Sequence, residues 1–272
     1  MSNTFEGDAI VANLIDKLAG QGLGKYTELI RKISAPCISL QKEDAAGPLA
    51  PGASKFGGAP DLPPGTDIPA VGGRPLALLA QINLSDLEIA GLEHPFPKRG
   101  ILSFYYDTEN QPWGSGEEDE RDGWRVQFFD GDPTQLERIE VPEDAMLPEF
   151  AVSFEAAESI DADALIDMDF DDDDAEEIFE LVENGEPKHQ MLGFPFAVQN
   201  PVFMETAHYC DGVEDWDEAE KAADDYVLLF QMDSDDDLDA MWGDMGMLYF
   251  SIKKEDLADG RFDRTKMIMQ CS

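Results

Sequence analysis

Two stretches of the chain, 75–106 and 226–252, share one pattern of hydrophobic and polar positions. Each consists of an apolar run, a polar connection and a second apolar run that follows a glycine. In the alignment, LLAQIN (78–83) lies over LLFQMD (228–233), and GILSF (100–104) lies over GMLYF (246–250). Short apolar runs bounded by turn residues predict β-strands. The pattern therefore predicts two similar β-rich units that arose by internal duplication.

Further elements are expected around these units. Helical spacing of apolar residues predicts helices at 5–18 and 25–33, and a short strand is expected at 37–40. The glycine- and proline-rich segment 47–73 contains GGAP (57–60), a turn signal echoed by LGFP (192–195). Strands are also expected at 124–129 and 148–154, and helices at 175–182 and 217–225, the first of them on an acidic segment.

Together these patterns predict an α+β fold in which two similar β-rich units share a core, with N-terminal helices and an acidic helical insertion. The expected division is 1–40 for N-terminal helices that pack on the core, 41–138 for the first unit, 139–188 for the acidic insertion and 189–272 for the second unit. We expect these parts to form one compact domain, since 272 residues suffice for one large core.

Charge is the unusual feature of the composition. The chain carries 59 acidic and 19 basic residues, a net charge of −40. Residues 139–252 alone hold 34 acidic residues against two basic ones, Lys188 and Lys221. Such a field repels phosphate backbones, which argues against nucleic-acid binding, and it attracts a basic protein or cations. Adaptation of a whole proteome to salt is an alternative explanation for the same acidity.

The sequence also bears on the compartment. No apolar run reaches the roughly 18 residues that span a bilayer, and the N-terminus lacks the basic start and apolar segment of a secretory signal. Cys37, Cys210 and Cys271 are too few and too scattered for a disulfide framework. We therefore expect a cytoplasmic protein that does not interact with membranes; the oligomeric state is left open.

Five separated motifs occur in a characteristic order: KFGGAPDLP (55–63), PLALLAQINLSDL (75–87), HQMLGFP (189–195), LLFQMDSD (228–235) and WGDMGMLYFSIKKEDL (242–257). With these motifs the chain resembles the YwqG-like family of bacterial proteins, from about Lys55 to the C-terminus. The resemblance implies an α+β fold. It implies no catalytic residues, because the biochemical role of that family is not established. The very acidic middle of this chain departs from the family pattern.

Polar side chains within the two apolar strands are the candidate ligand-binding residues. Strand alternation places Leu79, Gln81 and Asn83 on one face, and Leu229, Gln231 and Asp233 on the corresponding face of the second unit. A buried amide needs hydrogen-bond partners. These groups either hold the irregular loops by bonding to their backbone, or meet in a cleft between the units that binds a small polar ligand or peptide. Lys55 joins this set as a rare cation in an acidic chain.

Four aspartates form a weak candidate metal site: Asp233, Asp235, Asp237 and Asp244. Their spacing resembles a calcium loop, but Leu238 stands where that loop needs glycine, and its last ligand would be Asp244 instead of glutamate. Strands flank the segment, whereas the calcium loop lies between helices. The sequence therefore favours a solvated acidic connection, and no metal or cofactor is predicted.

Other catalytic patterns are weak. Gly57-Gly58 follows Lys55, but the phosphate-loop pattern and its helix are missing. His208-Tyr209-Cys210 is the closest His/Cys pair, and nothing in the sequence completes a triad or a zinc site around it. We therefore expect no catalytic residues in this chain.

The sequence is consistent with two functions. The first is a non-enzymatic cytoplasmic binding protein whose acidic surface docks a basic protein, as an inhibitor or immunity-type factor. The alternative is a small-molecule-binding enzyme with a pocket between the units, where Gln81, Asn83, Gln231 and Asp233 orient the substrate and Lys55 or an aspartate acts as acid or base.

Overall fold

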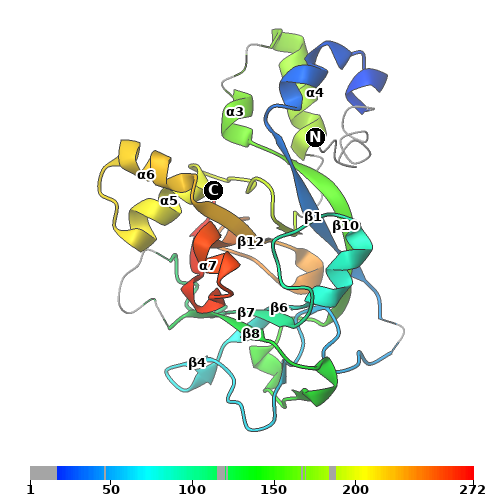
Figure 1. Ribbon diagram of the computed structural model, residues 1–272, viewed down its shortest axis with the longest axis vertical. Coiled ribbons are helices and arrows are strands. Elements are labelled where there is room, and N and C mark those ends of the chain that lie inside the picture. Colours follow the sequence, from blue (N-terminus) through cyan, green and yellow to red (C-terminus); the bar gives the residue numbers. More distant parts are fainter. Residues whose placement is uncertain are drawn as a thin grey trace.

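The structure, a computed structural model, describes residues 17–45, 47–114, 120, 122–166, 168, 170–183 and 188–272. Its largest element is a ten-stranded antiparallel sheet in the order β14-β13-β12-β11-β1-β10-β2-β6-β7-β8 (Figure 1). Two small ribbons, β3–β9 and β4–β5, lie outside it. The strands are β1 (Ser34–Glu43), β2 (Lys55–Phe56), β3 (Asp61–Leu62), β4 (Ala70–Val71), β5 (Arg74–Pro75), β6 (Ala77–Asn83), β7 (Ile101–Tyr106), β8 (Trp124–Phe129), β9 (Glu137–Arg138), β10 (Phe150–Ile160), β11 (Gln190–Met191), β12 (Tyr226–Asp233), β13 (Met247–Lys253) and β14 (Lys266–Gln270).

Helices are short and lie outside the sheet. In the described part of the chain, residues 17–20 are helical, and the α-helices whose bounds lie within it are α2 (Thr27–Ile30), α3 (Ala162–Ile166), α4 (Asp172–Glu183), α5 (Val202–Glu205), α6 (Trp216–Ala223) and α7 (Lys254–Ala258). The 3₁₀ turns are η2 (Gly24–Tyr26), η3 (Leu84–Ala90), η4 (Pro133–Gln135), η5 (Glu143–Ala145), η7 (Asp236–Leu238) and η8 (Phe262–Arg264), while η6 (Thr206–Cys210) is a π-helix. In the described part of the chain, no helix combines the length and the apolar character needed to cross a bilayer.

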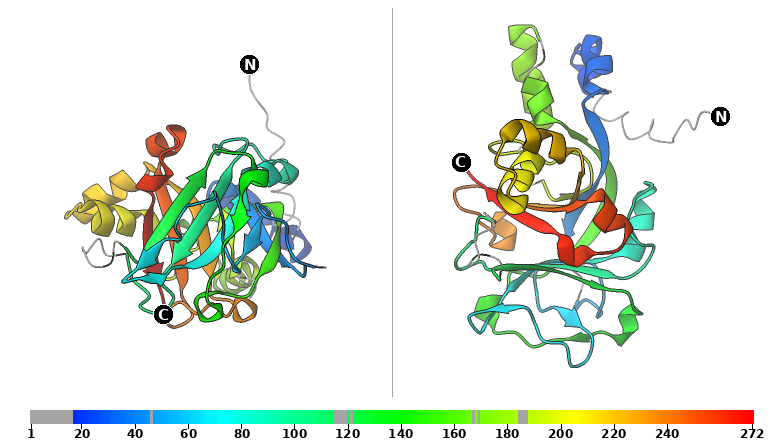
Figure 2. Two further views of the ribbon diagram at one scale, coloured as in Figure 1. Left: turned by 90° about the horizontal axis from the view of Figure 1, so that it is seen from below. Right: turned by 60° about the vertical axis from the view of Figure 1, so that its left-hand side comes forward.

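The sheet consists of a central ribbon and two arms. The ribbon pairs β1 with β10 over ten residues, from Ser34↔Ile160 to Glu43↔Ala151. The first arm, β2-β6-β7-β8, attaches to β10, and the second arm, β11-β12-β13-β14, attaches to β1. The arms curl toward each other, so that the sheet is nearly closed (Figure 2).

A β-bulge interrupts each arm. The pairing of β6 with β7 shifts register between Leu78 and Ala80, and the pairing of β12 with β13 shifts between Leu228 and Phe230. A bulge inserts one extra residue into a strand, so the alternation of faces is reversed on one side of it. The two shifts fall at positions that are aligned in the sequence pattern.

The bulges correct one prediction from strand alternation. Leu79 and Leu229 do not share a face with Gln81 and Gln231, because both leucines lie in the central hydrophobic core. The glutamines point to the opposite face of the sheet, where they bond to the loops that cover each arm. Each leucine is the extra residue of the bulge in its strand, which is the physical reason for the difference.

Aromatic rings from both arms fill the space between them. The centroid of Phe104 in β7 lies 4.8 Å from that of Phe230 in β12 and 5.2 Å from that of Phe250 in β13. Tyr106 meets Trp242 edge-on at 5.5 Å. All five rings are essentially inaccessible to solvent. The central core is therefore an apolar, aromatic contact between the two arms.

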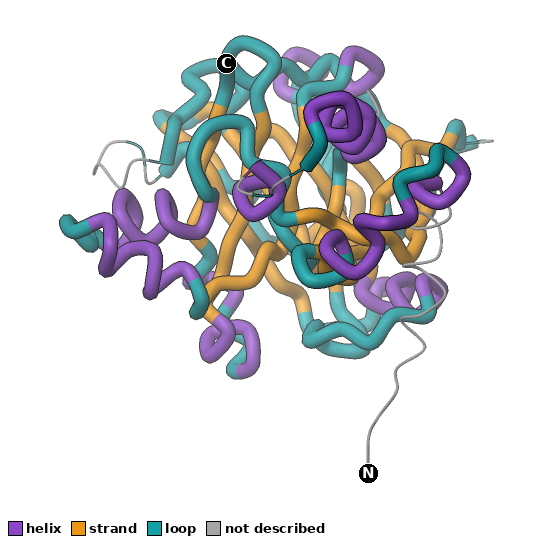
Figure 3. Tube along the Cα trace, turned by 90° about the horizontal axis from the view of Figure 1, so that it is seen from above, coloured by secondary structure: helices purple, strands orange, loops and turns teal. Residues whose placement is uncertain are grey.

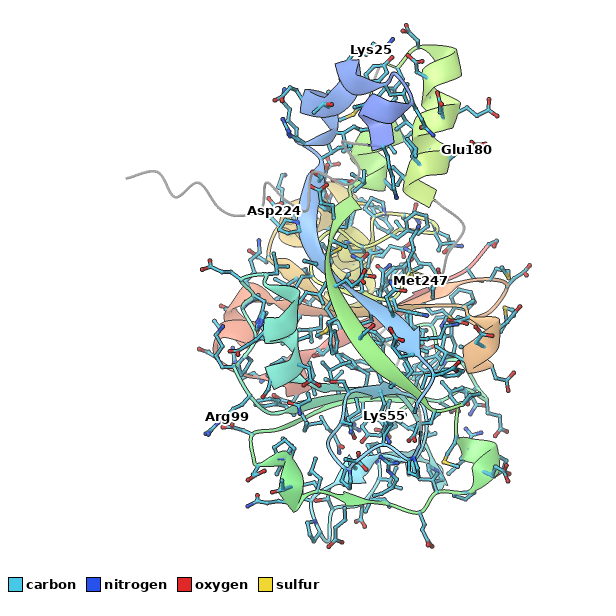
Figure 4. All side chains as sticks on the ribbon, turned by 90° about the vertical axis from the view of Figure 1, so that its right-hand side faces the viewer. Lys25, Lys55, Arg99, Glu180, Asp224 and Met247 are labelled. Carbon is cyan, nitrogen blue, oxygen red and sulfur yellow. The ribbon has the colours of Figure 1, made fainter. Side chains whose placement is uncertain are left out.

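The ribbon extends beyond both arms and carries a helical head, which we define as the described residues of 17–33 and 160–183 (Figure 1). The head has its own hydrophobic cluster, separate from the central core and built on Leu18, Leu23, Tyr26, Ile30, Ile33, Ile160, Leu165 and Ile178. Figure 4 shows Lys25 and Glu180 in this head, far from Lys55 in the body.

The outer faces of the two arms are covered differently. Loops and the β3–β9 ribbon cover the first arm, whereas α5, η6 and α6 lie beside the second (Figures 2 and 3). On this face of the second arm, Leu228, Met247, Tyr249 and Ile268 of the strands form a hydrophobic cluster with Val202 of α5.

The mixed fold with a large sheet and short helices confirms the α+β class. The two apolar runs expected within 75–106 are β6 and β7, the strand expected at 124–129 is β8, and the helices expected at 175–182 and 217–225 are α4 and α6. The helix expected at 5–18 lies largely outside the described residues. The four-part division of the chain and the internal duplication stay predictions.

Candidate functional site

Lys55 is fully buried in the first arm, where it pairs in register with Gln81. Its ammonium donates to the carbonyl of Ala59 and to Oε2 of Glu149, 3.0 Å away, and lies 3.9 Å from Oδ2 of Asp61. Burial lowers the pKa of Lys55, while the two carboxylates oppose that shift. The side chain is therefore held in an internal ion-pair network.

Asp61 is the centre of that network. Arg138 donates from Nε to Oδ1 at 2.9 Å, while Oδ2 accepts from Nε2 of Gln81 at 2.8 Å and from the backbone N–H of Gly52 at 3.0 Å. Burial alone would raise the pKa of Asp61, but the bonds from Arg138 and Gln81 outweigh it and hold the pKa below its ordinary value. Both carboxylate oxygens are thus engaged.

The amides of the first arm hold its covering loops. Oε1 of Gln81 accepts from the backbone N–H of Asp61 at 3.0 Å, and Nε2 donates to the carbonyl of Ala53 at 2.9 Å. Asn83 accepts from the N–H of Ser85, which caps η3, and donates to the carbonyl of Gly52. These contacts correspond to the loop-holding role considered for the two amides.

The second arm repeats the arrangement. Oε1 of Gln231 accepts from the backbone N–H of Phe196, and Nε2 donates to the carbonyl of Lys188, both at 3.0 Å. Asp233 accepts from the N–H of Lys188 at 2.9 Å. Burial raises the pKa of Asp233, although that hydrogen bond opposes the rise.

The structure brings the predicted ligand-binding residues together in two separate groups. Lys55, Gln81 and Asn83 meet under the loops of the first arm, and Gln231 and Asp233 meet under those of the second. Each group lies on the outer face of its arm, and the aromatic core occupies the space between the arms. The five side chains therefore do not share a cleft.

Three of the four aspartates of the candidate metal site, Asp233, Asp235 and Asp237, bond through their side chains to other parts of the chain. Asp235 bonds to Nε2 of His189 at 3.0 Å and to Nζ of Lys42 at 2.6 Å, and Lys42 also contacts Asp237 at 2.8 Å. Burial would raise the pKa of Asp235, but the bonds from His189 and Lys42 hold it well below its usual range. Within the described ranges, no three His, Cys, Asp or Glu side chains are grouped to hold a metal ion.

His208 and Cys210 are not arranged as a catalytic pair. Nδ1 of His208 lies 2.7 Å from the carbonyl of Val213, whereas the thiol of Cys210 donates to the carbonyl of Gly114 at 3.1 Å. Burial raises the pKa of Cys210 to about 12, so the thiol is protonated at neutral pH.

An exposed aromatic pair beside these residues was not singled out from the sequence. Tyr209 is 45% exposed and Trp216 is 41% exposed, and the ring of His208 stacks on Trp216 with centroids 3.9 Å apart. The π-helix η6 carries His208 and Tyr209, while Trp216 begins α6. Such π-helical turns are rare and are frequent at functional sites. A tryptophan between acidic residues is the sequence signal that identifies this place.

Exposed carboxylates flank Trp216 along the chain. We name the exposed residues of this surface the acidic–aromatic patch: Tyr209, Glu214, Asp215, Trp216, Asp217, Glu218 and Glu220. Asp215 caps α6 by accepting from the N–H of Glu218, which fixes the first turn of the helix. The patch lies on the side of the molecule that α5 and α6 occupy (Figure 1). It combines negative charge with exposed π-faces, the two features that bind cationic side chains.

Comparison with known proteins defines the family. Residues 54–271 match the family described as Domain of unknown function (DUF1963), and the chain belongs to this family. The matched region begins just before β2 and includes both arms, β10 and the acidic–aromatic patch. No curated protein matches the chain.

Proposed function

We propose that this chain is a non-enzymatic cytoplasmic binding protein whose acidic surface engages a basic protein, in the manner of an inhibitor or immunity factor. The observation that carries the proposal is the acidic–aromatic patch. Its carboxylates attract Lys and Arg side chains, and its rings give those side chains a specific place to stack, worth about 0.5–1 kcal/mol each at an exposed site.

The charge of the whole molecule supports the same partner. A net charge of −40 steers a basic protein toward the surface and speeds association at low ionic strength. A general field does not by itself define a contact surface. Two exposed rings meet in this region, Tyr209 and Trp216, with centroids 6.1 Å apart. The acidic loop after β7 also exposes a ring, that of Trp113, so the aromatic pair is the feature that we assign to docking.

A labelled arginine-rich peptide tests the proposal by fluorescence anisotropy, with a glutamate-rich peptide for comparison. We expect binding that weakens steeply as NaCl rises from 20 to 300 mM. The substitution Trp216→Ala should weaken binding about 5-fold, which corresponds to about 1 kcal/mol. The double substitution Asp217→Lys/Glu218→Lys should weaken it at least about 10-fold at low salt.

A matched control separates the patch from the general field. Glu143→Lys/Asp144→Lys changes the net charge equally on exposed residues of η5. If this control weakens binding as much as the substitutions on α6, or if salt has no effect on the affinity, the proposed docking surface is wrong.

We also propose that the two arms descend from one duplicated ancestor and that the chain falls with the YwqG-like bacterial members of its family. Equivalent contacts support duplication. In the first arm, the N–H of Asn83, two residues after Gln81, donates to the hydroxyl of Ser54. In the second arm, the N–H of Asp233, two residues after Gln231, donates to Nδ1 of His189. The YwqG-like assignment is supported by the five ordered motifs, and the cytoplasmic location by the three scattered, unpaired cysteines.

Equivalent turns in the two arms add to the evidence for duplication. Gly58 and Gly193 both have φ near +69°, and each is followed after one residue by a proline. The Nζ of Lys55 bonds to the carbonyl that precedes the first proline, and the Nε2 of Gln190 bonds to the carbonyl that precedes the second.

A further inference from the structure

The outer face of the first arm contains a pocket of about 220 Å³. Its floor is formed by β7 and β8, and its roof by the segment that contains β3 and the turn after it. The lining residues are Asp61, Leu62, Pro63, Thr66, Ile101, Ser103, Gln127, Phe128 and Phe129. The pocket is thus mainly apolar, with a few polar groups at one place, as is typical of small-molecule sites.

The corresponding place in the second arm is filled. In the first arm, Ser103 pairs with Gln127, and in the second arm Tyr249 pairs with Ile268. Ser103 and Tyr249 also occupy the same register position opposite the glutamine of their arm.

A tyrosine therefore takes the place of a serine, and an isoleucine that of a glutamine. The hydroxyl of Tyr249 donates to the carbonyl of Phe196 at 2.7 Å, and the ring packs with Ile268 in a buried cluster. The aligned small residue Ser103 leaves that volume open in the first arm.

Among the polar side chains that line the pocket, Gln127 has an atom without a hydrogen-bond partner. Oε1 of Gln127 is buried and accepts no hydrogen bond from the described residues. An unsatisfied buried acceptor destabilises the folded chain, and a hydrogen-bond donor on a ligand would remove that penalty. Asp61, by contrast, already bonds through both oxygens to Arg138 and Gln81 among other groups, so its charge is neutralised within the protein.

We propose that this pocket binds a small neutral molecule with an aromatic or similar apolar ring and one N–H or O–H group that donates to Oε1 of Gln127. A cation would find the carboxylate of Asp61 already paired, and an anion would be repelled by the net charge of the chain. A cavity of about 150 Å³ holds a benzene molecule, so a pocket of about 220 Å³ is large enough for a fused two-ring compound.

This pocket is separate from the acidic–aromatic patch and is independent of the basic-partner proposal. The patch lies on η6 and α6 beside the second arm, whereas the pocket lies under the loops of the first arm. Binding of a neutral ring should hardly depend on salt, whereas the peptide binding proposed above weakens with salt. Failure of one proposal is therefore distinguishable from failure of the other.

The test uses two probes of nearly equal shape, indole and benzothiophene. Indole has an N–H donor, and benzothiophene has sulfur at the same place. Ligand-observed NMR titration of the full chain should show indole binding at least about 5-fold tighter than benzothiophene, with little change between 20 and 300 mM NaCl. Gln127→Leu should abolish that preference, and Ser103→Tyr should abolish binding of both probes by filling the pocket as Tyr249 does in the second arm.

Gln41→Leu, an identical change at an exposed position on β1, is the matched control and should bind as the unsubstituted chain does. Circular dichroism and thermal melts establish that each variant is folded. If Ser103→Tyr fails to fold, Gln127→Leu decides the matter alone. The proposal is overturned if neither probe binds, if both bind equally to the unsubstituted chain, or if a folded Gln127→Leu chain keeps the preference for indole.

Discussion

Asp61 joins the loops of the first arm to its buried cation. The carboxylate receives Arg138 and Gln81 directly and lies next to Lys55, whose ammonium has no exposure to solvent. An isolated buried charge is very costly, and it is tolerated only where opposite charges and hydrogen bonds surround it. The network therefore depends on Asp61 more than on any single one of its partners.

We predict that Asp61→Asn destabilises the chain by about 3–5 kcal/mol at pH 7, the usual cost of breaking a buried pair. The substitution keeps the shape of the side chain but leaves Lys55 and Arg138 with less compensating charge. Chemical denaturation followed by tryptophan fluorescence measures the change. Asp67→Asn, an exposed change in the same loop, should have an effect within about 0.5 kcal/mol.

The same substitution should flatten the dependence of stability on pH. The pKa of Asp61 is lower in the folded chain than in the unfolded one, so its contribution is complete above about pH 4 and is lost as the pH falls through the folded-state pKa. We therefore expect the difference between the unsubstituted chain and Asp61→Asn to shrink from pH 7 to pH 3. A difference that stays constant over this range would contradict the assigned role of the charge.

At the scale of the elements, the helical head is held together by a small apolar cluster, by the ion pairs of Lys25 with Asp171 and Asp174, and by the hydroxyl of Tyr26. The hydroxyl of Tyr26 donates to Asp174 at 2.9 Å and accepts from the backbone N–H of Asp171 at 3.1 Å. It thereby fixes the start of α4 against the helices before β1. Because the head cluster is separate from the central core, we expect the head to open without unfolding of the arms.

Tyr26→Phe should weaken the head by about 1–2 kcal/mol, because two hydrogen bonds are lost and the ring remains. Hydrogen exchange with peptide-level mass spectrometry is the measurement. Amide exchange in α4 should accelerate by roughly 5- to 30-fold, while exchange in β12 stays unchanged and serves as an internal control. Equal acceleration in both elements would show that the head and the arms unfold together.

Five strands of the arms, β6, β7, β8, β12 and β13, could be predicted from sequence, because their apolar runs are long and most follow a glycine or proline, whereas the strands β2, β11 and β14 were not predicted. The direction of particular side chains could not. A bulge leaves no clear signal in an unbroken apolar run, so Leu79 and Leu229 were assigned to the wrong face. The glutamines stand out in the sequence, but their partners are backbone groups of loops and, for Gln81, also the carboxylate of Asp61, and loop paths depend on the whole fold.

The pocket under the first arm was beyond sequence reasoning for a related reason. The pocket depends on the small side chain of Ser103, which occupies in the first arm the position that Tyr249 occupies in the second. That equivalence is seen only when the strand register of both arms is known. The length of β10, which runs to Ile160 and carries the head, was likewise underestimated, because its polar residues alternate irregularly. Contacts between distant segments decided each of these features.

At the scale of the whole molecule, two opposing effects set stability. The aromatic contact of Phe104, Phe230 and Phe250 draws the arms together and buries a large apolar area. The net charge of −40 acts against every compact state, because folding brings like charges closer. The first effect is nearly independent of ionic strength, and the second is not.

Salt should therefore stabilise this chain through screening. The Debye length falls from about 30 Å at 0.01 M to about 10 Å at 0.1 M, so most repulsion across the molecule is removed within that range. We expect Tm to rise by at least about 2 °C between 0.01 and 0.1 M NaCl, which for a chain of this size reflects roughly 0.5–1 kcal/mol. Screening depends on ionic strength and not on the identity of the anion, so sodium perchlorate should raise Tm equally at these low concentrations. A Tm that is flat in both salts would mean that the carboxylates lie too far apart, or are too well paired, for their repulsion to oppose folding.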